Sequence, residues 1–166
     1  MKLFIFVSLL QGFAIFVDEV FFHLKRGLPK WERVGHPIDT LTVVACLLFL
    51  YFTERTFANE IIYYVMAAIS CICVTKDEWV HRKYCSAEEM WLHGVLFMLH
   101  PLVLFSGMAA WETAKPAFLG LAVGVFAFFV YEVVYWNFIW QKSSKVMHMQ
   151  TRKRVDQNEL YEYFGE

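Results

Sequence analysis

Five long blocks of apolar residues limit the fold of this chain more than any other feature of its sequence. A helix needs about 20 mostly apolar residues to cross the hydrocarbon layer of a membrane. The blocks approach that length, and backbone groups in lipid must pair within the chain, so helices are the expected form. We expect membrane spans at residues 3–22, 37–52, 57–74, 90–111 and 116–140.

The composition also indicates a membrane protein. Hydrophobic residues make up 58% of the 166 residues, and aromatic residues 19%, whereas a soluble domain is about 45–50% apolar. The net charge of −1 gives no sign of a basic face for nucleic acid, which we do not expect as a partner. We predict an all-α integral membrane bundle of five helices at residues 1–140, followed by a cytoplasmic tail at residues 141–166.

The basic residues are distributed unevenly over the two ends of the predicted spans. Three of the 15 Lys and Arg residues, namely Lys2, Arg55 and Lys115, fall at one end, and the others fall in the loops after spans one and three and in the tail. By the positive-inside rule, we expect the N-terminus outside and the C-terminus in the cytoplasm. The tail can form an amphipathic helix, on the membrane or over a site, or remain unstructured.

Carboxylates and histidines gather at the predicted cytoplasmic ends of the spans, in an order that occurs twice. The copies read Asp18-Glu19-x3-His23 with Glu32-x3-His36, and Asp77-Glu78-x2-His81 with Glu89-x3-His93. This repetition predicts that the first four spans form two pseudo-repeated hairpins around one shared site. We also expect His36 to cap the second span, because Pro37 is a favoured first helical residue.

The spacing within each copy predicts a metal site. Residues three or four apart on a helix share a face, and an ionisable residue at a membrane span indicates a function. The predicted ligands are Glu19, His23, His36, Glu78, His81, Glu89 and His93. Supporting contacts or an additional ligand are expected from Asp18, Asp39, Asp77, His100 and Glu132. The competing interpretation is a ring of solvated polar residues, in which Glu32 pairs with the basic residues of its loop.

Mixed carboxylate and imidazole ligands favour iron, and they also suit manganese and zinc; copper is less favoured because copper(I) prefers softer ligands. The number of candidate ligands suits two metal ions. For Glu132, which lies inside the fifth span, the expected partner is His100 or the metal cluster.

Two of the spacing patterns resemble those of known metalloprotein families. Glu78-x2-His81 resembles the Glu-x-x-His element of ferritin-like di-iron carboxylate bundles. Glu19-x3-His23-x12-His36 resembles the pattern of the C subunit of copper membrane monooxygenases that act on methane and ammonia. The second copy, Asp77-x3-His81-x11-His93, differs from that pattern by one residue. These resemblances imply a membrane metal centre that activates dioxygen.

The leading hypothesis is therefore a membrane dimetal oxidoreductase that acts on an apolar, lipid-phase substrate and receives electrons from a donor protein. Two alternatives stay open. One is a non-enzymatic metal- or haem-binding subunit or a metal carrier. The other is a zinc-dependent membrane hydrolase, which needs only three protein ligands and a carboxylate base.

Overall fold

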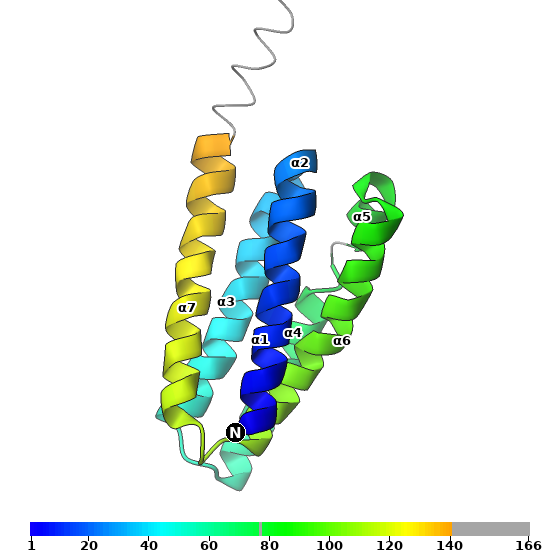
Figure 1. The fold of residues 1–166 in the computed structure, drawn as a ribbon. Coiled ribbons are helices and arrows are strands. Elements are labelled where there is room, and N and C mark those ends of the chain that lie inside the picture. Colours follow the sequence, from blue (N-terminus) through cyan, green and yellow to red (C-terminus); the bar gives the residue numbers. More distant parts are fainter. Residues whose placement is uncertain (77, 141–166) are drawn as a thin grey trace, which may run out of the picture.

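The computed structural model describes residues 1–76 and 78–140, and in this part of the chain every regular element is a helix (Figure 1). The prediction of an all-α protein is therefore confirmed for these residues. The tail at residues 141–166 and Asp77 lie outside the described residues, and the predictions made for them are not addressed by the fold.

The helices run alternately in opposite directions along the bundle (Figure 1). The first helix consists of α1 (Lys2–Val17), the π-helical segment η1 (Asp18–His23) and α2 (Leu24–Arg26). It is followed by α3 (Lys30–Phe52), α4 (Phe57–Cys73), α5 (Glu78–Tyr84), α6 (Ala87–Ala109), α7 (Lys115–Val134) and the π-helical segment η2 (Tyr135–Ile139). This alternation places the ends rich in His and carboxylates together at one end of the bundle.

Four helices are long and apolar enough to cross a membrane, namely Lys2–Arg26, Lys30–Phe52, Ala87–Ala109 and Lys115–Ile139. Large apolar side chains are exposed on the outside of the bundle; Leu9 is 70% exposed and Phe13 64%. Such exposure is typical of a surface that contacts lipid rather than water. The α4 helix is apolar but has only 17 residues, so the fifth membrane span stays a prediction.

The start of α3 differs from the prediction. The helix begins at Lys30, after Pro29 in an extended conformation, and Pro37 lies inside it. The prediction that His36 caps a helix beginning at Pro37 is therefore wrong. Proline leaves the carbonyl four residues earlier without its helical donor. Here that carbonyl belongs to Arg33, and the side chain of Asn137 donates to it at 3.4 Å.

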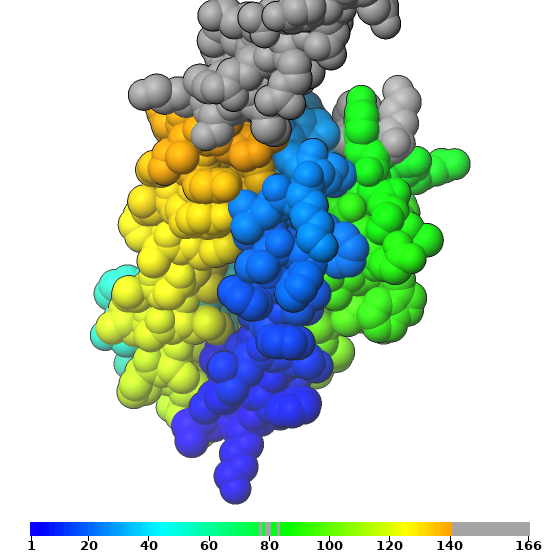
Figure 2. All heavy atoms as spheres, turned by 45° about the horizontal axis from the view of Figure 1, so that its top comes forward, coloured from blue at the N-terminus to red at the C-terminus, as the bar shows by residue number. Residues whose placement is uncertain are grey.

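The apolar core lies at the end of the bundle that contains the N-terminus. Phe4, Leu50, Tyr63, Trp111 and Phe118 are almost fully buried there. Above this core α1 packs mainly against α6, whereas α3 packs against α7 and α4. Figure 2 shows α1 between α7 and the α5–α6 segment on one face of the molecule. The predicted pseudo-repeat of two hairpins stays a prediction.

Two local features fix the chain near the polar end. Gly27 follows α2 with φ 75° and ψ 161°, a region that is essentially restricted to glycine. A Cβ atom at this position would overlap the indole of Trp140, so the turn and the end of the last helix lie in close contact. Ser86 caps α6, because its hydroxyl accepts a hydrogen bond from the backbone N–H of Glu89 at 3.3 Å.

Candidate metal centre

Four buried side chains from η1 and α6 form the core of the candidate site. Asp18 and His23 lie on η1, and Glu89 and His93 lie on the first two turns of α6. One ligand atom from each residue lies within 4.8 Å of the corresponding atoms of the other three. The fold therefore brings together residues that the sequence assigned to different copies of the pattern.

The distances from Asp18 to the two histidines are those of neighbouring metal ligands, and Glu89 lies somewhat farther away. The Nε2 atom of His23 lies 3.2 Å from Oδ2 of Asp18 and 3.9 Å from Oε1 of Glu89. The Nε2 atom of His93 lies 3.2 Å from both carboxylate oxygens of Asp18. Metal–ligand bonds of about 2.1 Å place neighbouring ligand atoms about 3.0–3.4 Å apart. This buried His/Glu/Asp group can hold a metal ion.

The π-helical geometry of η1 brings Asp18 and His23 onto the same face. These residues are five positions apart, which matches the i to i+5 repeat of a π-helix and not the repeat of an α-helix. Glu19 lies four positions before His23, and its Oε2 faces Nδ1 of the same imidazole at 3.0 Å. Both carboxylates therefore contact His23, one at each ring nitrogen.

The surroundings of Glu19 differ from those of Asp18. The hydroxyl of Tyr131 and the indole N–H of Trp136 both donate to Oε1 of Glu19, at 2.6 and 2.9 Å. The other carboxylate oxygen faces Nδ1 of His23. When Nδ1 of His23 donates to Glu19, Nε2 is left facing Asp18, and a carboxylate that holds the far ring nitrogen in this way is common for metal-bound histidines.

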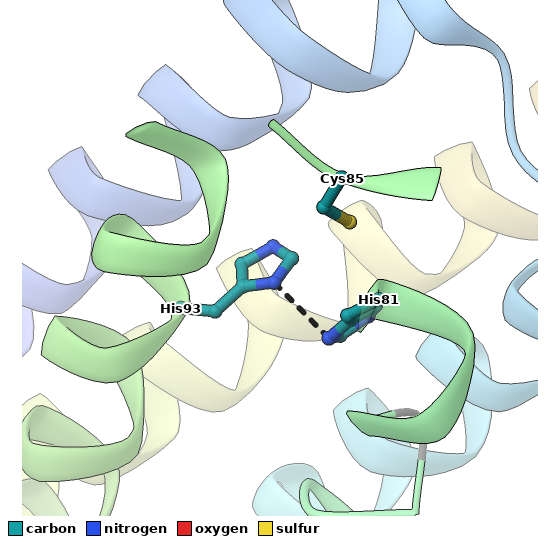
Figure 3. A group of neighbouring side chains, drawn as sticks. All are labelled: His81, Cys85 and His93. Carbon is teal, nitrogen blue, oxygen red and sulfur yellow. Dashed lines mark hydrogen bonds between the residues drawn. The ribbon is translucent and has the colours of Figure 1, made fainter. Parts of the chain in front are cut away.

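A second group shares His93 and adds His81 and Cys85 (Figure 3). His81 lies on α5, and Cys85 lies on the segment that joins α5 to α6. The Nδ1 atoms of His81 and His93 are 3.1 Å apart. His93 therefore directs Nδ1 toward the second group and Nε2 toward Asp18. Cys85 was not among the ligands predicted from the sequence, although its position four residues after His81 was a signal.

Burial changes the protonation of the second group. It lowers the pKa of His81 from 6.5 to about 3, and the nearby His93 acts in the same direction. It also raises the pKa of the Cys85 thiol. His81 is therefore neutral at physiological pH and has a lone pair available for a metal ion or for a proton on His93.

The guanidinium of Arg26 joins three segments of the chain next to these groups. Its Nε and Nη2 donate to Oε1 of Glu89 at 3.1 and 2.8 Å, and its Nη1 donates to Oε2 of Glu32 at 2.9 Å. Glu32 is fully buried, and Nε2 of His81 lies 3.7 Å from its other carboxylate oxygen. Glu32 thus pairs with a basic residue, as the competing interpretation of the sequence expected. The pair differs from that expectation because Glu32 is buried and not solvated. Arg26 was not among the site residues predicted from the sequence.

The remaining predicted ligands lie at the edge of the site. The ring of His36 is 5.1 Å from that of His23, and its Nε2 is buried without a hydrogen-bond partner among the described residues. Glu78 is the first residue of α5 and belongs to neither group in the described part of the chain.

Three residues that were expected to support the site have other partners. Asp39 pairs with Lys76 at 2.5 Å. His100 lies 3.0 Å from the hydroxyl of Ser70 through Nε2 and 3.4 Å from the amide of Gln11 through Nδ1. Glu132 accepts a hydrogen bond from the hydroxyl of Thr40 at 2.8 Å, and this donor takes the place of the expected partner His100.

A cavity of about 630 Å³ extends from the first group into the middle of the bundle. Its lining includes Asp18, His23 and His93 of the first group and further polar side chains, among them Gln11, Thr40, His100 and Glu132. Apolar side chains from four helices form much of the remaining wall, including Ile15, Val43, Leu96, Val103, Leu121 and Phe128. A cavity of this size with apolar walls and a few converging polar groups is typical of a site for a small molecule.

Comparison of the chain with models of known protein families, with curated proteins and with solved structures finds no match.

Proposed function

We propose that this chain is a multi-pass membrane oxidoreductase whose metal centre acts on an apolar substrate taken from the lipid phase. The observation that carries the proposal is that three members of the Asp18, His23, Glu89 and His93 group, namely Asp18, His23 and His93, line a cavity that also has many apolar side chains in its wall. Such a position puts a bound ion within reach of a substrate while apolar side chains exclude water.

The proposed ligands of the first ion are Asp18, His23, Glu89 and His93. Glu19 then acts as the residue that fixes the ring of His23, because its carboxylate oxygens are already occupied by Tyr131, Trp136 and His23 itself. This assignment exchanges the roles that the sequence pattern suggested for Asp18 and Glu19.

The charges of the site favour a cation. Asp18 and Glu19 are buried, and neither contacts a lysine or an arginine among the side chains that the structure describes. A buried carboxylate requires a counter-charge, because its transfer from water is costly. A divalent ion between Asp18 and the neighbouring histidines supplies that charge.

A second ion would bind His81 and Cys85 and share His93. Since one imidazole would then use both nitrogens as ligands, His93 would have to lose both of its ring protons. With a single ion, the Nδ1 atom of His93 instead shares a proton with His81, at the observed distance of 3.1 Å. The number of metal ions per chain distinguishes these two arrangements.

Iron is the proposed metal, because carboxylate and imidazole ligands suit an ion that activates dioxygen. Insertion of one oxygen atom into a C–H bond converts the other oxygen atom to water and consumes two electrons and two protons, which a donor protein and the solvent must supply. Arg26 and Glu19 hold ligands in place in this scheme, and the cavity wall positions the substrate.

Zinc is the second candidate, and a specific observation favours it. The thiol of Cys85 and the imidazoles of His81 and His93 are common zinc ligands. A single zinc ion there would support a hydrolase, with a carboxylate as the base.

The test is the metal content of the protein purified without added metal, together with the behaviour of two matched variants. We expect His93→Gln to lose bound metal. We expect His100→Gln to retain it, because His100 lies on the same helix and is equally buried but belongs to neither group. The reduced wild-type protein should then be re-oxidised by dioxygen, as followed by optical spectroscopy.

Iron that is lost only in His93→Gln supports the proposal, and one zinc per chain supports the hydrolase. A folded wild-type protein without metal would contradict both.

A further inference from the structure

The cavity reaches the outside of the bundle between α1 and α7. Gly12 and Phe16 of α1 and Gly124 of α7 line it and are exposed. A Cβ atom placed on either glycine would meet nothing within 4 Å. The two glycines therefore border an open mouth.

The two helices touch on either side of this mouth. The rings of Phe4 and Phe118 are 5.0 Å apart at one end, and the hydroxyl of Tyr131 donates to Glu19 at the other. With a rise of 1.5 Å per residue, these contacts are separated by about 20 Å along the helices. The α1 helix packs closely against α6 and not against α7. Between the two contacts, α1 and α7 are therefore far enough apart to leave room for the mouth.

The surroundings of the mouth are mainly apolar. Phe13, which follows Gly12, and Val123, which precedes Gly124, are 64% and 62% exposed; Gln11, which precedes Gly12, is half-buried and lines the cavity. Both helices are long and apolar enough to cross a membrane, and the mouth lies near the middle of their length. The molecules that face such a mouth in a membrane are the alkyl chains of lipids.

The dimensions of the cavity suit an alkyl chain. Its volume of about 630 Å³ lies inside the range of about 300–1,000 Å³ that is usual for small-molecule sites. Gly12 precedes Asp18 by six residues, which corresponds to about 9 Å along the helix. A chain that passes the mouth therefore reaches the carboxylate and imidazole groups within this distance, along a wall in which polar side chains such as Gln11 and Thr40 lie among the apolar ones.

We propose that a single alkyl chain of a lipid-phase molecule passes sideways from the membrane through the mouth at Gly12 and Gly124 and lies in the cavity, with one of its carbons next to His23 and His93. That the bound alkyl chain belongs to a substrate rests on the proposed function, whereas the binding of the alkyl chain requires only the cavity and the mouth. The two can therefore be tested separately.

The experiment uses the full chain in lipid vesicles and a palmitate analogue with a diazirine at mid-chain. Mass spectrometry after photolysis identifies the labelled residues. We expect the segment of α6 that contains Leu96 and Val103 to be labelled, and unlabelled palmitate to compete. We expect the variant with both Gly12→Phe and Gly124→Phe to lose this labelling, because the new rings fill the mouth.

The matched control is Gly120→Phe, one turn from Gly124 on the same helix. Gly120 also has open space around it but does not line the cavity, so this variant should be labelled like the wild type. If the double variant fails to fold, the two single variants replace it. Undiminished labelling in the double variant, an equal loss in the control, or labelling restricted to lipid-facing residues would each overturn the inference.

Metal content measured on the same samples keeps the two proposals apart. Competitive labelling of the cavity in a metal-free protein would support the lateral route and contradict the metal centre. A metal-containing protein without labelling of the cavity would support the metal centre and contradict the lateral route.

Discussion

At the scale of single residues, Asp18 and Glu19 are neighbours in the chain with different surroundings. Asp18 faces two imidazoles through both of its oxygens. Glu19 accepts hydrogen bonds from a phenol and an indole and contacts the far side of the His23 ring. A carboxylate that is occupied in this way orients a ligand more readily than it binds an ion itself.

We therefore expect Asp18→Asn to weaken metal binding more than Glu19→Gln does. Loss of a residue that orients a metal ligand costs about 10–100-fold in affinity, and loss of a charged ligand costs more. Competition with a chromogenic chelator measures both values. The reverse order would restore Glu19 to the ligand role that the sequence pattern suggested.

A second residue-scale prediction concerns His81 in the metal-free protein. Its pKa is about 3 when folded and 6.5 as a model value, so the unfolded state takes up the proton more readily. The contribution of His81 to stability is fully present above pH 6.5 and is lost as the pH falls from 6.5 toward 3. Unfolding in detergent with excess chelator should show this loss. His81→Gln should reduce the slope over that range, and an unchanged slope would contradict the assignment.

Helical spacing and membrane depth singled out His23, His81, Glu89 and His93 from the sequence, because polar residues at one depth tend to converge inside a bundle; the same rule also chose Glu78, which belongs to neither group in the described part of the chain. Arg26 was missed, since a basic residue in a loop is also what the positive-inside rule requires. Asp18 was ranked below Glu19 because spacing rules assume α-helical turns and the chain forms a π-helix there.

At the scale of elements, the two π-helical segments lie where the site is built. η1 carries Asp18, Glu19 and His23, and η2 carries Trp136, which donates to Glu19. π-Helical turns are rare overall, but many of those that occur lie at functional sites.

The apolar blocks predicted most helix positions, but hydropathy marks the part of a helix that faces lipid. The first turns of α3, with Lys30 and Arg33, therefore escaped the prediction.

The turn at Gly27 gives a prediction at this scale. Gly27→Ala should lower the free energy of unfolding by about 1–3 kcal/mol, because its backbone conformation strongly disfavours a side chain and a Cβ atom would displace Trp140. Unfolding in a denaturing detergent measures the change. Gly94→Ala is the control, since Gly94 is helical with open space around it. Equal stability of the two variants would show that the close contact with Trp140 is unimportant.

At the scale of the whole molecule, the fold separates the basic residues as the sequence suggested. Lys25, Arg26, Lys30 and Lys76 lie toward the end of the bundle with the site, whereas Lys2, Arg55 and Lys115 lie toward the opposite end. The orientation of this asymmetry in the membrane follows from the positive-inside rule and remains a prediction.

We expect the end with the site to face the cytoplasm. A membrane-impermeant maleimide added to intact cells should label Arg55→Cys and should label Lys30→Cys only after the cells are opened, relative to the background of the four native cysteines. Labelling of both positions in intact cells would contradict the predicted topology.

The bridge from Arg26 on α2 to Glu89 on α6 and Glu32 on α3 has a consequence for the lifetime of a bound ion. On this side of the site, an ion held by Glu89 and its neighbours would be covered by segments that this guanidinium ties together, so its release in this direction requires those segments to open locally. Exchange of a bound ion with the surrounding solution would then be slowed by this opening step. A metal bound by this group would then be selected in part by which ions are available while the helices assemble.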